Sequence, residues 1–302
     1  MIQVVLDSLV RASELSLLAV GLTLVYSVLR FPNFAHVEFA TIGAYVALFL
    51  SSGLGFNMVI ASIIAMVVAG GLGIGCDRAI FARLRRSTPI MLMITSFALG
   101  IAMREAVRMF GGPSPYFYEL GLQRPWEVLG GRLTPVQAGI IAVACVSMLA
   151  FHLLLNRTKL GTAMRATADN QQLAEANGIY TERVIQVVWF IGCAFAALGG
   201  ILIALDTQLQ PNMGFAIIIP VFAAAILGGI GQPYGAMLGA VILGFAENVG
   251  LSIDWGALLS HTGLVSAQYV YIPTGYKAGI AFAILILVLL VRPRGLLGAK
   301  AR

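Results

Sequence analysis

The chain has 302 residues, of which 59% are hydrophobic and only 11% are charged, and its formal net charge is +6. Soluble domains carry about 25% charged residues, so this composition excludes an ordinary soluble protein and indicates a polytopic membrane protein. The basic excess fits membrane orientation better than nucleic-acid binding. The start, MIQVVLDSLVRASELSLL, has no basic segment and no small-residue cleavage site, so we expect no removable signal peptide.

Apolar stretches of about 20 residues, the length a helix needs to cross a bilayer, recur along the whole chain. We expect spans near 9–29, 35–51, 57–77, 88–110, 135–155, 184–205, 213–228, 236–253 and 274–291. Only helices and closed barrels satisfy their backbone groups in lipid, and these runs are long and continuous. The predicted fold class is therefore all-α, a single transmembrane domain over residues 1–302 with eight or nine crossings. The span at 213–228 is short, and Pro220 is expected to interrupt it.

The first apolar run is followed by a break near residues 30–35. Pro32 disfavours a helix at the preceding residue, and Asn33 is a suitable N-cap for a helix that restarts one or two residues later. Glu38 then falls near the first turn, where the helix dipole favours an anion. Two interpretations remain open: a plain turn with a good cap, or a broken helix that dips into the bundle, as in transporters. In the second, Asn33, His36 and Glu38 line the substrate pathway.

Basic residues indicate which side of the membrane each connection occupies. Lysines and arginines gather in 78–86, in 156–183 and in the C-terminal tail, and the sequence has none in 206–212 or 254–273. The three basic regions are separated by two and then four spans, so all three can lie in the cytoplasm. We therefore expect a cytoplasmic C-terminus and, by counting back, an external N-terminus. The 111–134 loop is then external, as either an ordinary connection or a docking surface.

Residues 156–183, NRTKLGTAMRATADNQQLAEANGIYTER, are too long and polar for a tight turn. The absence of Gly and Pro between Gly161 and Gly178 predicts one or two short helices outside the membrane, opened and closed by these glycines. They could form an amphipathic interfacial helix without a partner, or a protein-docking element. The candidate docking residues are Gly161, Arg165, Ala166, Asp169, Glu175, Ala176 and Gly178.

Several charged residues inside the spans lie near helix ends. Glu105 and Arg108 can pair at i, i+3, and Arg11 and Glu14 repeat this pattern in the first span. We expect these side chains to pair and to extend toward the interface, rather than to bind a substrate.

The sequence lacks the motifs of ATP-binding and hydrolytic sites. It contains no G-x-x-x-x-G-K-[ST], H-E-x-x-H or G-x-S-x-G, and His36, His152 and His261 have no ligand spacing. We therefore expect no enzyme activity, no metal site and no cofactor, so any uphill transport must draw its energy from a partner or an ion. Glu247 and Asn248, deeper in a span, are expected either to bond a neighbouring helix or to line a pathway.

A second break is expected near 228–235, where Gly228, Gly229, Gly231 and Pro233 interrupt two apolar runs. Corresponding interruptions in the two halves of a chain are typical of transport sites.

Three segments, in this order, resemble the branched-chain amino acid ABC importer permeases. GLTLVYSVLRFPNFAHVEFATIGAYVA resembles their N-terminal signature, LGTAMRATADNQQLAEANGI their ATPase-contacting segment, and LGGIGQPYGAMLGAVILGFAEN their C-terminal glycine-rich signature. The match spans roughly residues 15–295. Val37 stands where the family generally has glycine, and Gln232-Pro233-Tyr234 is bulkier than the family's small residues.

The resemblance implies an inner-membrane permease subunit that imports branched-chain or other amino acids, urea, amides or aromatic acids by alternating access. It would pair with a second related permease and two cytoplasmic ATPases, and receive substrate from a periplasmic binding protein. Two other classes remain open from the residues alone. An ion-coupled secondary transporter has only Glu247 as a candidate ion-binding group, and a channel would need a selectivity ring.

Overall fold

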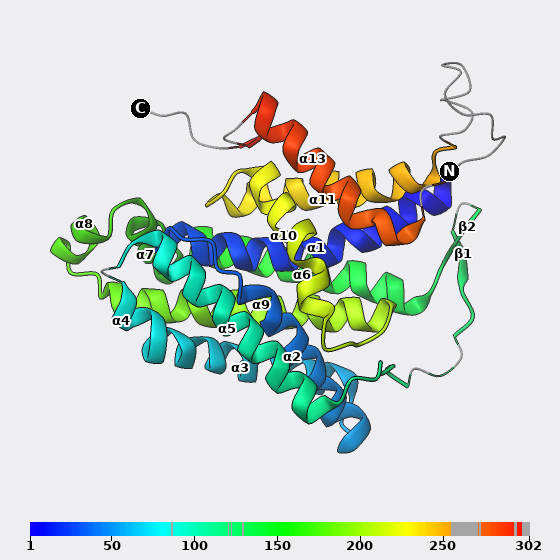
Figure 1. Cartoon of the computed structure of the whole chain (residues 1–302), viewed down its shortest axis with the longest axis horizontal. Coiled ribbons are helices and arrows are strands. Elements are labelled where there is room, and N and C mark those ends of the chain that lie inside the picture. The colour runs from blue at the N-terminus through cyan, green and yellow to red at the C-terminus, as the bar shows by residue number, and fades with distance from the viewer. Residues whose placement is uncertain are drawn as a thin grey trace.

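The computed structural model describes residues 1–85, 87–119, 121, 123–128, 130–254, 271, 273–292 and 295–297, and within them the chain is almost entirely helical (Figure 1). The α-helices are α1 (Ile2–Leu29), α2 (His36–Leu48), α3 (Met58–Cys76), α4 (Ala82–Leu84), α5 (Pro89–Gly111), α6 (Pro135–Arg157), α7 (Lys159–Asp169), α8 (Gln171–Ala176), α9 (Thr181–Asp206), α10 (Met213–Gly228), α11 (Pro233–Ser252) and α13 (Lys277–Val291). π-Helical turns at Phe49–Gly53 and Asp77–Phe81 extend α2 and join α3 to α4, and a 3-10 turn, Thr274–Tyr276, precedes α13.

Six helices in the described part of the chain are long and apolar enough to cross a membrane: α1, the joined α3–α4, α5, α6, α9 and α11. α10 and α13 are shorter apolar helices. The prediction of a polytopic all-helical fold is confirmed. One local departure lies in the 111–134 loop, where β1 (Trp126–Val128) and β2 (Gly131–Leu133) pair as a short antiparallel ribbon.

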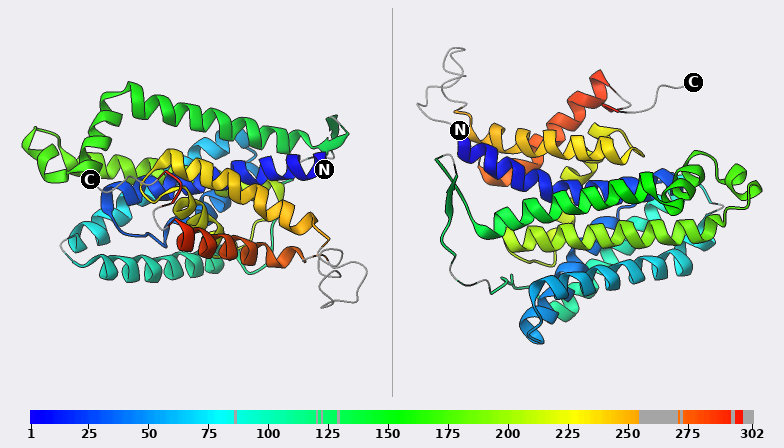
Figure 2. Two further views of the ribbon diagram at one scale, coloured as in Figure 1. Left: turned by 90° about the horizontal axis from the view of Figure 1, so that it is seen from above. Right: turned by 180° about the vertical axis from the view of Figure 1, so that it is seen from behind.

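The molecule has two ends along its long axis, which we call the α7 end and the ribbon end (Figures 1 and 2). α1 begins at the ribbon end, where the Gln3 side-chain oxygen accepts a hydrogen bond from the Arg132 amide at 2.8 Å. It finishes at the α7 end, where the Arg30 guanidinium donates to the Ala168 carbonyl at 2.5 Å. α9 runs the opposite way, so the two helices lie antiparallel.

α1 and α9 form the centre of the bundle. In their most apolar stretches 78% and 83% of residues are buried, against 17% in α5. Small residues bring the two helices together: a Cβ on Gly21 would lie only 2.7 Å from the Gly192 carbonyl oxygen. Farther along, Trp189 of α9 stacks on Phe81, which stacks on Phe31 just after α1. This column of rings joins three separate parts of the chain in the core.

After α1 the chain turns back into the bundle. Residues 30–35 are not helical, and the Phe34 amide donates to the Ser96 hydroxyl of α5 at 3.1 Å. A Cβ on Gly100, the residue at the middle of α5, would lie 3.4 Å from Ala35. α2 therefore begins about halfway along α5, inside the bundle.

A second return follows α9 and enters from the ribbon end. Residues 207–212 are not helical, and Leu209 pairs with Tyr116 through two backbone hydrogen bonds of 2.9 Å. α10 then starts against α2, where the Gly214 amide donates to the Thr41 hydroxyl at 2.9 Å. The units α1–α2 and α9–α10 thus enter from opposite ends and meet inside, an inverted arrangement that many transporters share.

Helix boundaries differ from the predictions at three points. α2 begins at His36 rather than at Phe34 or Ala35, because the Asn33 side chain accepts the Ala35 amide and holds residues 34 and 35 in a turn. Pro220 does not interrupt α10, which continues through it; a buried proline removes a single backbone hydrogen bond.

The third difference concerns how the two breaks correspond. The predicted break near 228–235 is present as a tight turn between α10 and α11, with Gly229 and Gly231 at positive φ. The counterpart of the first break is instead the return at 207–212. The basic residues Arg86, Arg294, Lys300 and Arg302 and most of the 254–273 connection lie outside the described residues.

Candidate functional site

The beginning of α2 carries three buried polar side chains. Asn33 and His36 are fully buried, and Glu38 is 4% exposed. The Asn33 amide nitrogen and Glu38 Oε2 have no hydrogen-bond partner among the described residues, and the His36 ring lies beside the Leu18 backbone of α1. A buried unpaired polar group costs about 1–3 kcal/mol, and polar groups inside a membrane bundle mark functional sites. These residues form the leading candidate site, which we call the α2 cluster.

His36 lies against α1. A Cβ on Gly21 would come within 2.9 Å of His36 Nε2, so the ring occupies space that exists only because α1 carries a glycine there. The imidazole therefore contacts the central helix pair directly, where Gly21 also meets Gly192.

Glu38 lies where the N-termini of α2 and α10 meet. A Cβ on Gly214 would lie 2.8 Å from Glu38 Oε2 and 2.7 Å from the Thr41 hydroxyl. The dipoles of both helices favour a negative charge or an anionic ligand at this point. The Arg104 guanidinium also reaches the first turn of α10, where it lies 5.1 Å from the centre of the Phe215 ring. A carboxyl group and a guanidinium thus both lie at the start of α10.

Thr41, Ser96, Arg104 and Gly214 were missed as site residues by sequence reasoning. Arg104 belongs to a charged group near the end of a span, and the expected pairing is present there: Arg108 lies 3.8 Å from Glu105. No spacing in the sequence shows that Arg104 also faces α10. An amide-to-hydroxyl contact between positions 173 residues apart has no local signal either.

An apolar cavity of about 290 Å³ adjoins the first break. Phe34 covers one side, stacked on Phe222 of α10 at 4.8 Å and edge-on to Phe97 of α5 at 6.0 Å. The lining residues are Leu22, Thr23, Tyr26, Pro32, Phe34, Phe222, Ala225, Ile226 and Ile230. The cavity has the size and character to hold a small aliphatic group.

Glu247 and Asn248 belong to a different place. Glu247 is fully buried, and its carboxylate accepts a hydrogen bond from Arg11 Nε at 3.0 Å. Arg11 also pairs with Glu14 at 3.3 Å, as expected, so one guanidinium holds two carboxylates. The α2 cluster meets α1 at Gly21, ten residues farther along, or about 15 Å at the helical rise. The structure therefore contains the predicted helix-to-helix bond for Glu247, and its pathway role, like that of the half-buried Asn248, stays a prediction.

The segment 156–183, predicted to form one or two short helices, forms two, α7 and α8. Gly178, with φ +82°, follows α8 as predicted. Gly161 does not open α7: Thr158 caps the helix, and Gly161 is buried inside it. A Cβ at Gly161 would lie 2.3 Å from the Leu154 carbonyl oxygen, so this glycine allows α7 to pack on α6.

The outer face of this segment is exposed. Asp169, Glu175, Ala176 and Gly178 are exposed, and Ala166 is half-buried. The remaining candidate, Arg165, is also exposed, but its guanidinium is engaged by α6.

A shallow depression of about 470 Å³ lies beside α8. Its lining residues are Glu175, Gly178, Ile179, Tyr180, Thr181, Glu182 and Arg183. Tyr180 is 75% exposed, and the Arg183 guanidinium lies 5.2 Å from the centre of its ring. Hydrogen bonds from Thr181 and Gln171 lower the pKa of Glu175. The depression thus combines an exposed ring with charges of both signs.

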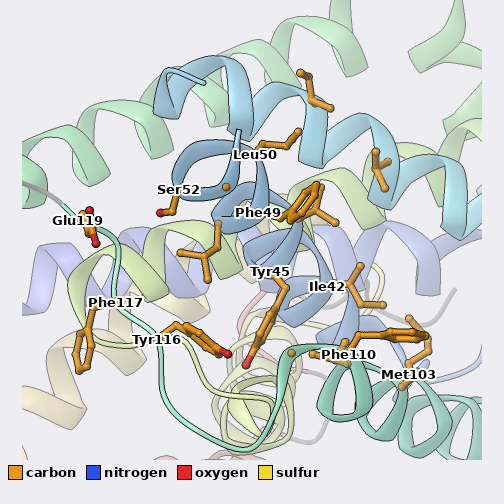
Figure 3. Close-up of a pocket in the computed structure, with 18 residues that line it drawn as sticks. Ile42, Tyr45, Phe49, Leu50, Ser52, Met103, Phe110, Tyr116, Phe117 and Glu119 are labelled. Atoms are coloured by element: carbon orange, nitrogen blue, oxygen red, sulfur yellow. The ribbon is translucent and has the colours of Figure 1, made fainter. Parts of the chain in front are cut away.

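A larger apolar cavity, about 840 Å³, lies between α2, α3, α5 and the chain after α5 (Figure 3). Tyr45 and Tyr116 meet edge-on at 6.1 Å, and the Tyr45 hydroxyl has no partner among the described residues. Phe49, Phe110 and Phe117 are each more than 60% exposed. None of the predicted site residues lines this cavity.

The part of the chain that the structure describes contains no group of three His, Cys, Asp or Glu side chains arranged to hold a metal ion. His152 instead contacts Tyr234, with 3.0 Å between its Nδ1 and the tyrosine hydroxyl. His261 lies outside the described residues.

Comparison with known proteins gives a near full-length match. A family model described as "Branched-chain amino acid transport system / permease component" matches residues 4–289. The high-affinity branched-chain amino acid transport system permease protein LivH of Escherichia coli (strain K12) is 32% identical, with 98% of this chain and 95% of that protein covered. The corresponding permease protein BraD of Pseudomonas aeruginosa is 29% identical over the same shares.

Two more distant proteins also match. The ribose import permease protein RbsC of Escherichia coli (strain K12) is 25% identical, over 79% of this chain and 74% of that protein. Among solved structures, PsaBC from Streptococcus pneumoniae in complex with Fab aligns with a TM-score of 0.50 at 12% identity, covering 96% of this chain and 92% of that chain. At this identity the likeness concerns the fold alone.

Proposed function

The chain belongs to the family of branched-chain amino acid transport permeases, and from this premise we propose that it forms the membrane pathway of an ABC importer for branched-chain amino acids. The observation that carries the proposal is the 32% identity to a branched-chain amino acid permease over 98% of the chain. The subunit itself is a permease and not an enzyme, so ATP hydrolysis falls to its partners.

The geometry inside the bundle supports a transport role. Glu38 and Arg104 both lie at the first turn of α10, where a solute with an ammonium and a carboxylate would find one partner for each group. The neighbouring cavity of about 290 Å³ is lined mainly by apolar side chains and suits a branched aliphatic group. We propose that Asn33, His36 and Glu38 line the translocation path.

We propose that α7 and α8 dock a cytoplasmic ATPase. Supporting features are the exposed Leu173 and Tyr180, and the depression beside α8 with its charges of both signs. A second related permease, two ATPase subunits and a periplasmic binding protein would complete the importer. ATP-driven closure of the ATPases would move α7 and α8 and open the pathway alternately to the two sides.

We propose a bacterial inner-membrane location, with the α7 end in the cytoplasm and the N-terminus outside. Contacts of the C-terminal segment support placing the tail on the same side of the membrane as α7 and α8. The Leu296 amide donates to the Leu227 carbonyl at 2.8 Å and the Leu297 amide to the Gly228 carbonyl at 3.0 Å, at the end of α10 that faces α7. A phosphatase fused to the C-terminus is expected to be inactive; activity in the periplasm would contradict this orientation.

The test is reconstitution of the chain with its partner permease, both ATPases and the binding protein in liposomes. Uptake of labelled leucine, isoleucine and valine is expected only with ATP and the binding protein. ATP-independent uptake driven by an ion gradient would contradict the proposal. ATP-driven uptake of urea, an amide or an aromatic acid, without uptake of the three amino acids, would retain the importer and replace the substrate.

A further inference from the structure

α7 is tied to the rest of the bundle at its C-terminal end by Arg30. The Arg30 guanidinium donates to the carbonyl of Ala168, in the last turn of α7, at 2.5 Å. A helix C-terminus presents unpaired carbonyls and favours a cation. The tie therefore has the chemistry of a cap, supplied from a residue 138 positions earlier in the chain.

The backbone of Arg30 is unusual. It follows α1 with φ 57° and ψ 27°, and it is the one non-glycine residue with positive φ among the described residues. Glycine is the usual residue at this place, and another residue there costs about 1–2 kcal/mol. An arginine at a position suited to glycine indicates that its side chain has a role, and here the guanidinium bonds α7.

A second tie leaves α7 nearer its middle. Arg165 donates to the Leu155 carbonyl and, at 3.2 Å, to the side-chain oxygen of Asn156. The Asn156 amide in turn donates to the Tyr234 hydroxyl at 2.6 Å, and that hydroxyl lies 3.0 Å from His152 Nδ1. Tyr234 is the second residue of α11, so this chain of bonds joins α7 to α11 through the end of α6.

The two ties lead to the same place inside the bundle. Arg30 opens the return of residues 30–35, which ends at the α2 cluster. Tyr234 opens α11, which is locked to α10 because a Cβ on Gly228 would lie only 1.9 Å from the Gly235 carbonyl oxygen. The other end of α10 carries Gly214, next to Glu38. α7 thus has one connection to α2 and one to α10, the two helices that meet at Glu38.

We propose that Arg30 and Tyr234 are positioning residues that transmit the movement of α7 to α2 and α10 during transport. The inference rests on the proposed function, since it needs an ATPase that moves α7. One tie acts on α2 and the other on α10. The contact between α2 and α10, at Glu38 and Gly214, therefore opens or closes when α7 moves relative to the bundle.

The test compares Arg30→Gly, Arg30→Lys and Tyr234→Phe in the reconstituted importer, with leucine as solute. Arg30→Gly removes the tie while keeping the left-handed backbone, which glycine adopts without strain. Arg83→Ala is the control, because Arg83 is an exposed arginine of α4 with no hydrogen bond or ion pair in the described part of the chain. The readouts are assembled complex, basal ATP hydrolysis and leucine imported per ATP hydrolysed.

We expect Arg30→Gly and Tyr234→Phe to lower leucine imported per ATP about two- to thirtyfold, the range of single coupling residues, with normal assembly and basal hydrolysis. Arg30→Lys should restore at least half of the loss, and Arg83→Ala should match the wild type. Unchanged import per ATP in Arg30→Gly, or a loss that only follows the amount of assembled complex, would overturn the inference. A wild-type complex without ATP-driven import would contradict the proposed function instead.

Discussion

Gly214 offers the sharpest test of the contact between α2 and α10. In Gly214→Ala the new methyl group would lie 2.6 Å from the Val37 carbonyl oxygen, 2.7 Å from the Thr41 hydroxyl and 2.8 Å from Glu38 Oε2. A backbone carbonyl cannot rotate away as a long side chain can, so the start of α10 must move off α2. The amide bond from Gly214 to Thr41 would then lengthen or break.

The magnitude follows from three terms. Overpacking costs about 1–3 kcal/mol, and loss of one hydrogen bond costs about 1 kcal/mol. Alanine regains about 1 kcal/mol of helix propensity over glycine. The expected net destabilisation is therefore about 1–3 kcal/mol, with a further loss of uptake per assembled complex because the α2–α10 contact is displaced.

Gly139→Ala in α6 is the matched control, since a Cβ there would meet no atom within 4 Å. It should be neutral or stabilising by up to about 1 kcal/mol. The assay is thermal unfolding of the purified complex in nanodiscs, together with leucine uptake per complex. Equal unfolding temperatures and equal uptake for the two variants would refute the close contact between α2 and α10.

Three further outcomes are expected. Asn33→Ala and Glu38→Gln should each reduce uptake more than membrane abundance; proportional losses of both would make the break purely structural. Ala176→Trp, on the exposed face of α8, should block assembly with the ATPases or uncouple hydrolysis, and normal co-purification with normal coupling would contradict the docking proposal. The pKa of Glu175 is lowered in the folded protein, so its carboxylate stabilises the contact between α8 and Thr181. This stabilisation is fully present at pH values above the pKa of a free glutamate, and it is lost as the pH falls through the lower pKa of the folded state. The protection of the α8 amides against hydrogen exchange, taken relative to the intrinsic exchange rate at each pH, should therefore fall on acidification in the wild type but not in Glu175→Gln, and equal pH profiles would contradict the assignment.

Much of the architecture was predictable because it depends on local chemistry. The lengths of the apolar runs predict the spanning helices, Pro32 predicts the first break, and Gly178 predicts the end of α8. Each of these depends on the preferences of a few consecutive residues, which the sequence displays directly.

The rest depends on contacts between distant parts of the chain. Nothing local distinguishes α1 and α9 as the central pair, since every span is apolar. Their close approach depends on glycines that face the partner helix, Gly21 opposite Gly192 and Gly199 opposite Leu18. The return at 207–212 has the composition of an ordinary connection. Pro220 predicts a break by its local preference, but the surrounding bundle keeps the helix continuous.

The pairing of Arg11 has a consequence for how the chain is made. Its partner Glu247 lies 236 residues later, and at about 5–20 residues per second the ribosome needs about 12–47 s to reach it. During that interval α1 is already entering the membrane with a cation in it, which lipid accommodates poorly. Glu14, one helical turn away from Arg11, is synthesised within a second and can neutralise that charge at once. The local pair thus protects the first helix during insertion, and the distant one completes the bundle after most of the protein has been translated.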